Sequence, residues 1–345
     1  MRLAWLIALV SLGAAFACVD GTDFNTCDPC QPPIDAGVDA GGLDAGLDGG
    51  MDAGEVDSGV DAGTDAGESD GGVTVDEWNL EWFGDSSQDP SDDNLQAQNV
   101  ATVISGEGAD LFAVEEVVDY ARFHAMVDAM PGYASVLAKD RTVSNYWDYS
   151  GSQQVGLIYR LGAFSLDSAQ IILGGSSDEF AGRPPLEVSL TLHVNGAEVP
   201  LYVIILHMKA YADETSWGQR VAASADLKTY LDTTRAGDRV MVVGDWNDDL
   251  DESIACGTGT CEASPYANFE GEPASYQFAT QLFTDSNPEW GTTVAFATPI
   301  DHHLITNELF GNVIAGSPRV IKPAISGYGT TTSDHYPTSV RYRFP

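Results

Sequence analysis

Two polar side chains, Asp245 and Asn247, follow a short apolar stretch and are spaced so that they could act together. The stretch 239–243 is rich in valine, which predicts a buried strand. Residues two apart on a strand face the same side, so both side chains are expected to lie together. A carboxylate beside an amide donor can activate water and bind an anionic oxygen. Aspartate and asparagine also favour turns and helix N-caps, so this motif alone leaves both interpretations open.

Other polar residues with similar potential stand along or just beyond predicted strands. Apolar stretches predict strands over 73–83, 110–117, 155–160, 186–194, 199–206 and 340–344. The polar side chains that these and neighbouring segments present are Asn79, Glu116, His207, Asp301, Asp334 and His335. Each residue alone has an ordinary structural explanation, such as hydrogen-bonded packing. The ordered set, rather than any one member, indicates a site.

Several other ionisable residues are not expected to take part. Glu115 and Glu116 point to opposite faces of one predicted strand, so only one can serve an interior site. Glu115 is interpreted as a surface charge at the strand end. Four histidines are also placed outside the site, the first two as solvent-exposed residues: His124, His193, His302 and His303.

The rest of the chain supplies the elements that would position these side chains. Helices are predicted from a cap at Ser91 or Asp92 to Gly106, over 120–130 and over 216–232. Asn195-Gly196 predicts a type I′ turn that joins two strands into a hairpin. Many strands with interspersed helices predict one α/β domain, 76–345, in which two sheets form a sandwich.

The first 17 residues have the pattern of a secretory signal peptide. Arg2 precedes an apolar run over 3–16 that is too short to span a bilayer, and a small-x-small cleavage pattern follows at 15–17. Cys18 comes next, which resembles a bacterial lipoprotein whose cysteine is lipidated. We therefore expect export, either as a lipoprotein of the outer cell surface or periplasm, or as a secreted chain with a plain thiol at Cys18.

Residues 18–75 are acidic and low in complexity, with six copies of Asp-Ala-Gly and no lysine or arginine. Such a segment cannot bury enough apolar surface to offset its ordering entropy, so it is predicted to be a disordered linker. In an exported chain, Cys27 with Cys30 and Cys256 with Cys261 are expected to form local disulfides, which leaves Cys18 unpaired.

The chain is strongly acidic, with a formal net charge of −37. The part after residue 70 holds 38 acidic and 14 basic residues, a net charge of −24. An acidic body repels polyanions and does not bind nucleic acid tightly through counterion release. The charge argues against a processive DNA-binding protein, but not against a hydrolase whose bound metal supplies local positive charge.

Three motifs together carry a family resemblance. They are Ala113-Val114-Glu115-Glu116-Val117, Gly244-Asp245-Trp246-Asn247 and Ser333-Asp334-His335-Tyr336-Pro337. In this order they resemble the endonuclease/exonuclease/phosphatase superfamily, over most of 76–345. The resemblance implies a DNase I-like fold, a four-layer sandwich of two mixed β-sheets flanked by helices. It also implies metal-dependent hydrolysis of a phosphoester.

The resemblance implies a metal site at the first and last motifs. Glu116 would ligate Mg²⁺, with Asn79 and Asp334 close by, because Mg²⁺ prefers hard oxygen ligands. Mn²⁺ or Ca²⁺ could replace it. A tyrosine that contacts the phosphate has three candidates: Tyr146, Tyr159 and Tyr211. Arg183-Pro184-Pro185 resembles a family segment near the substrate, although proline at these positions also suits a rigid loop.

The resemblance assigns the remaining residues to the reaction. His335 would pair with Asp301, which orients the imidazole and favours its charged form; whether His335 is a general base or a phosphate ligand stays open. Asp245 would position or deprotonate the attacking water. Asn247 and His207 would donate to the non-bridging oxygens.

These observations predict an exported, monomeric, metal-dependent phosphodiesterase. A nuclease acting on DNA or RNA is the leading interpretation, because an exported enzyme meets extracellular nucleic acid. A phospholipid or small-phosphoester hydrolase is the alternative. A non-catalytic surface module is disfavoured, because the metal, water and phosphate positions are all filled by competent residues.

Overall fold

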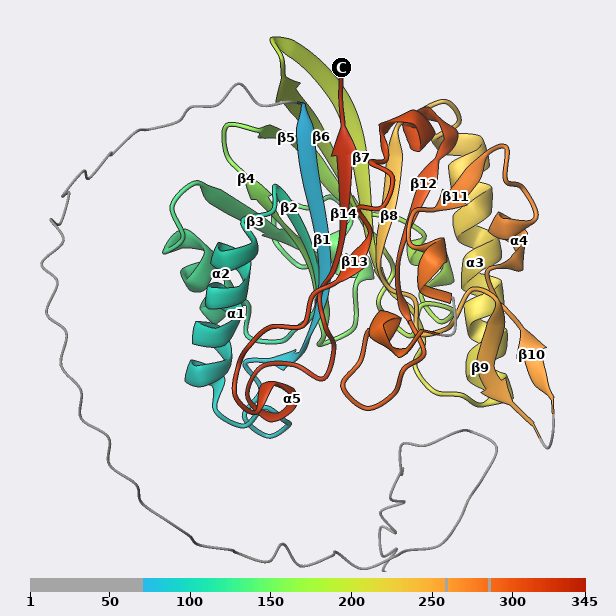
Figure 1. The fold of residues 1–345 in the computed structure, drawn as a ribbon, viewed down its shortest axis with the longest axis horizontal. Coiled ribbons are helices and arrows are strands. Elements are labelled where there is room, and N and C mark those ends of the chain that lie inside the picture. Colours follow the sequence, from blue (N-terminus) through green and yellow to red (C-terminus); the bar gives the residue numbers. More distant parts are fainter. Residues whose placement is uncertain (1–70, 258–259, 285–286) are drawn as a thin grey trace, which may run out of the picture.

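Two β-sheets face each other in the fold, and helices cover their outer faces (Figure 1). The computed structural model describes residues 71–257, 260–284 and 287–345. Strand β1 (Gly72–Phe83) begins just before the predicted domain start at 76. The predicted signal peptide, the proposed lipid site at Cys18, the Cys27–Cys30 pairing and nearly all of the linker lie outside the described residues.

The first sheet has six strands in the order β13-β14-β1-β2-β4-β3. Besides β1 they are β13 (Arg319–Val320), β14 (Thr338–Arg343), β2 (Leu111–Val117), β4 (Gln154–Arg160) and β3 (Tyr133–Leu137). β1 and β2 run parallel, with Asn79 opposite Glu115 in register. The polar ends of these two central strands therefore meet at the same edge.

The second sheet has six strands in the order β11-β12-β8-β7-β6-β5. They are β11 (Tyr276–Phe278), β12 (Asp301–Thr306), β8 (Val240–Asp245), β7 (Ala197–His207), β6 (Leu186–Val194) and β5 (Phe164–Ile171). The pairing registers put His207 opposite Asp245 and Asp245 opposite Asp301. Three predicted site residues are thus neighbours across adjacent strands.

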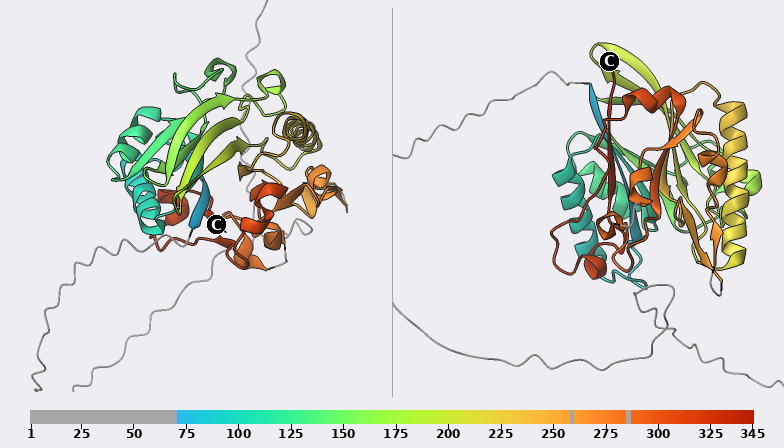
Figure 2. Two further views of the ribbon diagram at one scale, coloured as in Figure 1. Left: turned by 90° about the horizontal axis from the view of Figure 1, so that it is seen from above. Right: turned by 45° about the vertical axis from the view of Figure 1, so that its right-hand side comes forward.

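Helices form the two outer layers (Figure 2). α1 (Asp93–Glu107) and α2 (Tyr120–Asp128) pack on the first sheet, and α3 (Glu214–Thr234) packs on the second. Short helices α4 (Ala267–Glu270) and α5 (Tyr328–Thr331) lie in the later loops. Asp92 caps α1 by accepting from two backbone N–H groups, which confirms one of the two predicted caps. None of the helices in the described part has the length and apolar character needed to cross a membrane.

A continuous apolar core joins the two sheets. Alternate residues of the facing strands fill it, among them Val75 and Leu111 on one side and Val203 and Met241 on the other, all fully buried. Burial of such a side chain stabilises the fold by about 1.5–3 kcal/mol. At one edge this apolar interior gives way to buried polar residues, which is where the site lies.

The four-layer DNase I-like sandwich is confirmed, and so is the predicted hairpin. Asn195 and Gly196 have φ of 51° and 78°, as a type I′ turn requires. Seven strands were not predicted: β3, β5, β9 (Glu252–Cys256), β10 (Cys261–Ala263), β11, β12 and β13. Most are short, β5 is largely exposed, and β12 opens with the polar residues Asp301, His302 and His303, so tertiary pairing rather than an apolar pattern specifies them.

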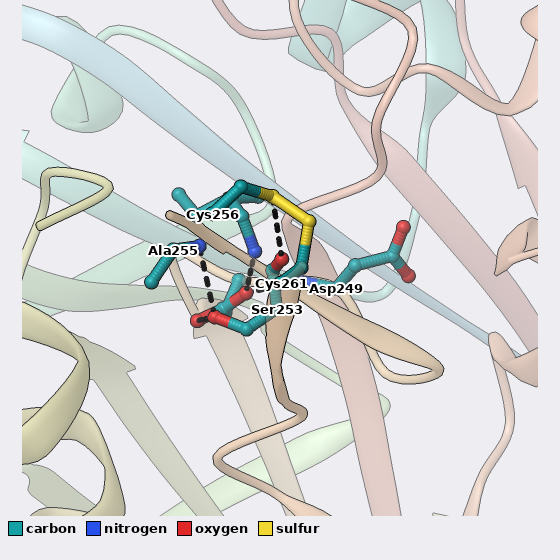
Figure 3. Close-up of a disulfide and its surroundings, with 7 residues drawn as sticks. Asp249, Ser253, Ala255, Cys256 and Cys261 are labelled. Carbon is teal, nitrogen blue, oxygen red and sulfur yellow. Dashed lines mark hydrogen bonds between the residues drawn. A yellow bond between two sulfur atoms is a disulfide. The ribbon is translucent and has the colours of Figure 1, made fainter. Parts of the chain in front are cut away.

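A disulfide joins Cys256 to Cys261 and closes the β9–β10 hairpin, as predicted (Figure 3). Ser253 lies beside it, and its hydroxyl donates to the carboxylate of Asp248 over 2.7 Å. Asp248 also accepts from the fully buried guanidinium of Arg220 on α3, at 2.8 Å. The hairpin and α3 together therefore hold the loop that follows Asp245.

Candidate active site

The predicted site residues converge at one edge of the sandwich, where strand ends of both sheets meet. Seven of them lie in a connected group: Asn79, Glu116, His207, Asp245, Asn247, Asp301 and His335. The eighth, Asp334, stands at the rim with its side chain about half exposed, 52%. Asp334 Oδ1 lies 4.0 Å from His335 Nε2.

A glycine allows β8 to bring Asp245 beside β7. Gly244 has φ of 154°, and a Cβ there would lie 2.0 Å from the carbonyl oxygen of Leu206. Only glycine permits this approach of the two backbones. After Asp245 the chain turns at Asn247, whose φ of 54° suits asparagine better than most residues. Trp246 is buried between them, and its indole N–H donates to the carbonyl of His302.

Asn79 links the carboxylates of the two sheets. Its amide nitrogen donates to Glu116 Oε1 over 3.2 Å and to Asp245 Oδ2 over 3.1 Å. Glu116 is turned toward the site by a positive φ of 60° at an irregularity in the β1–β2 pairing. Its second oxygen accepts from the backbone N–H of Trp82. Asn79 acts as a donor here, and its predicted role as a metal ligand stays a prediction.

His335 and Asp301 form a buried, hydrogen-bonded pair. His335 Nδ1 lies 3.0 and 3.1 Å from the two oxygens of Asp301, and its Nε2 lies 3.9 Å from Asp245 Oδ2. Burial by itself would lower the pKa of His335, but Asp301, Asp334 and Asp245 together raise it well above its ordinary value. The imidazolium form is therefore favoured near neutral pH.

Asp245 is poised to exchange a proton near neutral pH. Burial, and then repulsion from Asp301, raise its pKa to about 7, although His335 and the Asn79 hydrogen bond oppose the shift. A carboxylate with this pKa is a more effective general base at pH 7 than an ordinary aspartate. The geometry therefore suits the predicted role of Asp245 toward an attacking water.

His207 and Asn247 flank Asp245 on the other side. His207 Nε2 lies 3.5 Å from Asp245 Oδ2 and 3.7 Å from Glu116 Oε1. Burial, with the nearby charges of Arg183 and His335, lowers the pKa of His207 well below its ordinary value, so the ring is neutral. The Asn247 amide donates to the Met208 carbonyl over 3.2 Å. Both residues thus present N–H groups along this edge.

Glu81 is a site residue that the sequence reading missed. Its Oε2 is buried without a hydrogen-bond partner, and burial followed by the charge of Asp334 raises its pKa to about 8. Strand alternation gives no signal for it, because the backbone at Glu81 has a φ of 49° and departs from regular strand geometry. Three carboxylates crowd together at Glu81, Glu116 and Asp334, and hard oxygen donors of this kind fit a divalent cation such as Mg²⁺.

A second set of ligand atoms lies deeper. Asp245, Asp301 and His335 each offer an atom within 4.8 Å of the others, and such a group could hold an ion. In this arrangement, however, His335 Nδ1 is already committed to Asp301. Because Mg²⁺ prefers oxygen ligands and keeps several waters, the partly open carboxylates around Glu116 fit that ion better.

Two predictions about residues outside the site are wrong. Glu115 is fully buried rather than a surface charge, because both faces of β2 are covered by other layers. Burial and the charge of Asp245 raise its pKa well above its ordinary value. His124 is half-buried rather than exposed, and its ring contacts Ser135 and Asp140 at 3.0 Å each.

The other histidines lie where they were predicted. His193 is exposed, whereas His302 and His303 are buried behind the site residues. His303 Nε2 bonds the hydroxyl of Thr338 rather than any catalytic group. Among the candidates for the phosphate-contacting tyrosine, Tyr159 pairs with Leu111, at the far end of β2 from Glu116. This position is too far along the strand for Tyr159 to take that role.

Comparisons with known proteins agree on one family. The profile of the Endonuclease/Exonuclease/phosphatase family matches residues 77–335. No curated protein sequence matches the chain.

Solved structures share the fold at low identity. TDP2 of D. rerio, complexed with single-strand DNA product, is 13% identical, with a TM-score of 0.55 over 79% of this chain and 99% of that one. The human nocturnin catalytic domain with bound sulfate is 16% identical, with a TM-score of 0.53 over 79% and 95%. An endonuclease/exonuclease/phosphatase from Bacteroides vulgatus is 13% identical, with a TM-score of 0.56 over 79% and 99%.

Proposed function

Because the chain belongs to the endonuclease/exonuclease/phosphatase family, whose members are metal-dependent phosphoric ester hydrolases, we propose that it is an exported, Mg²⁺-dependent phosphodiesterase that cleaves nucleic acid. The observation that supports this most directly is the connected, largely buried group formed by Asn79, Glu116, Asp245, Asp301 and His335. Four strands from the two sheets and the loop before β14 contribute to it, and such convergence of charge would be costly without a function.

The chain's own residues support hydrolysis by in-line attack of water. Asp245, with its pKa raised to about 7, would accept a proton from the attacking water. The charged His335, oriented by Asp301, would bind a non-bridging oxygen of the phosphate, and neutral His207 would donate to another. A bound Mg²⁺, held by Glu116 with Asp334 and Glu81 near it, would neutralise charge that develops on the phosphate and the leaving group.

Two observations favour nucleic acid over other phosphodiesters as the substrate. A structural neighbour, TDP2, has been solved with single-strand DNA product. The N-terminal sequence pattern also indicates export, where nucleic acid is accessible. A small phosphoester or phospholipid is the second candidate, because the lipoprotein-like position of Cys18 would hold the enzyme close to a membrane.

The test uses the full chain, with His335→Ala as the matched inactive variant. Each is incubated with plasmid DNA and with a chromogenic phosphodiester, in Mg²⁺ and in EDTA. Plasmid nicking by the wild type that EDTA and His335→Ala both abolish is the expected result. Turnover of the small diester without DNA cleavage would replace nuclease by the second candidate. Equal activity of His335→Ala would overturn the site assignment.

A further inference from the structure

Basic residues are distributed unevenly in this acidic protein. Of the 14 basic residues after position 70, six form ion pairs with Asp or Glu within 4.0 Å: Arg122, Arg160, Arg220, Lys228, Arg235 and Arg319. Seven of the others in the described part of the chain have no carboxylate within that distance. Three of these seven, Lys139, Arg183 and Lys209, are connected to the candidate active site. We call these three residues the cation row.

Hydrogen bonds connect the cation row to the candidate active site. Arg183 Nη2 donates to the Met208 carbonyl over 3.0 Å, and the Asn247 amide donates to the same oxygen over 3.2 Å. Lys209 directly follows Met208 in the chain. One end of the row therefore adjoins Asn247, a residue placed at the phosphate.

The other end of the row is held through Gly151. A Cβ at Gly151 would lie 2.7 Å from Arg183 Cγ, so the glycine makes room for the arginine. The Gly151 carbonyl in turn accepts from Lys139 Nζ at 3.4 Å. The three cations thus extend outward from the site in the order Lys209, Arg183, Lys139.

Arg183 is the most informative member because it is buried. Only 9% of the residue is exposed, and its two terminal nitrogens donate to neutral acceptors, the carbonyl of Met208 and the side chain of Gln153. Its Nε is buried without any hydrogen-bond partner. Burying a guanidinium without an adjacent anion is costly. An anion that arrives with the substrate nearby would compensate this charge and lower the cost.

Lys209 adds a second positive charge beside Arg183. Its ammonium lies over the exposed ring of Tyr211, 4.2 Å from the ring centroid. Burial, together with the charge of Arg183, lowers the pKa of Lys209. Two nearby cations that repel each other would both gain from one shared phosphate.

We propose that the cation row binds a second phosphate of the substrate, adjacent to the phosphate that is hydrolysed. The inference rests on the proposed phosphodiesterase function and narrows its substrates to molecules with at least two phosphates. A nucleic-acid strand has a neighbouring phosphate at every nucleotide. A dinucleoside pyrophosphate is a small molecule that also has a second phosphate beside the first. Local positive charge of this kind would offset the repulsion expected from the net charge of −24.

The test compares the full chain with Lys139→Gln/Lys209→Gln. Arg341→Gln serves as the control, because Arg341 is exposed on β14 opposite Thr74, near the start of β1 and away from Asn79. Substrates are dTpdT and the same dinucleotide with one additional 5′ or 3′ phosphate, together with a ten-nucleotide dT strand and a dinucleoside pyrophosphate. A second arm measures binding of the labelled dT strand by fluorescence anisotropy in EDTA as salt is varied.

We expect the wild type and Arg341→Gln to prefer one phosphorylated dinucleotide over dTpdT by about tenfold in kcat/KM per charge-assisted contact. The double variant should lose this preference. The slope of log K against log salt concentration for binding of the dT strand should fall in magnitude by about 0.7 for each lost contact. If the dT strand is hydrolysed faster than dTpdT but the pyrophosphate is not, the second phosphate comes from a nucleic-acid strand. If the pyrophosphate is also hydrolysed faster, a small molecule can supply it.

Two outcomes would overturn the inference. One is an unchanged preference in the double variant, with dTpdT still hydrolysed; this would leave the proposed function intact. The other is an unchanged salt slope in the binding arm, which decides the matter even if the wild type hydrolyses nothing. Failure of the wild type on every diester in Mg²⁺ would instead contradict the proposed function.

Discussion

The Asp301→Asn variant should shift the entire pH profile of hydrolysis to lower pH. The substitution keeps the shape of the side chain and removes a fully buried carboxylate 3.0 Å from His335 Nδ1. That charge raises the pKa of His335 and of Asp245. Without it, Asp245 would lose its proton at lower pH, which moves the acid limb down. His335 would also become neutral at lower pH, which moves the alkaline limb down.

The size of the loss at pH 7 follows from the hydrogen bond that is broken. A hydrogen bond to a charged group contributes about 1.5–3 kcal/mol. If His335 needs its charge only in the transition state, kcat/KM at pH 7 should fall roughly 10- to 150-fold. The assay is kcat/KM for a chromogenic phosphodiester from pH 5 to 9 at constant Mg²⁺.

The control for this experiment is Asp167→Asn, which removes one exposed carboxylate of β5 that accepts a hydrogen bond from Thr191. It should leave both limbs of the profile in place. Limbs that move in opposite directions in Asp301→Asn, or an alkaline limb that stays unchanged, would refute the pairing of His335 with Asp301.

Three further predictions concern stability. Arg220→Met should cost about 3–5 kcal/mol in denaturant unfolding because it strands Asp248, and adding Asp248→Asn should recover most of the loss; no recovery would contradict the ion-pair explanation. Burial raises the pKa of Asp76 from 3.8 to about 7. The stability that depends on its protonated form is therefore fully present below pH 4 and is lost as pH rises through 7. Asp76→Asn should therefore match the wild type at pH 4 and exceed it by about 4 kcal/mol at pH 8 in thermal or urea unfolding, and equal stability at pH 8 would be evidence against this burial effect. Gly244→Ala should prevent soluble expression or lower stability by more than about 3 kcal/mol, since its Cβ would collide with the Leu206 carbonyl; a near-native Tm would show that β8 can move away.

The order of the polar residues along the chain was sufficient to predict the fold and most of the site. Strand patterns locate Asn79 within one strand and His207 and Asp245 at the ends of two others, because alternation and apolar runs are local properties. The hairpin at Asn195-Gly196 was predicted for the same reason, since a type I′ turn depends on two adjacent residues.

Burial could not be predicted in this way. Glu115 resembles a surface charge at a strand end, yet the facing sheet and the flanking helices cover both faces of β2. Glu81 reaches the site through a backbone with φ of 49°, which strand alternation does not anticipate. The pKa values of Asp245 and His335 likewise depend on carboxylates brought from other strands.

The sequence by itself determined which residue types stand at which strand ends, and therefore the family and the class of chemistry. Only the tertiary structure decided which of them touch, since Asn79 and Asp245 are 166 residues apart in the chain and 3.1 Å apart in space. It also brought three cations without a carboxylate partner, Lys139, Arg183 and Lys209, together beside the site. Coulombic interactions and desolvation depend on distance and burial, and neither is a local property of the chain.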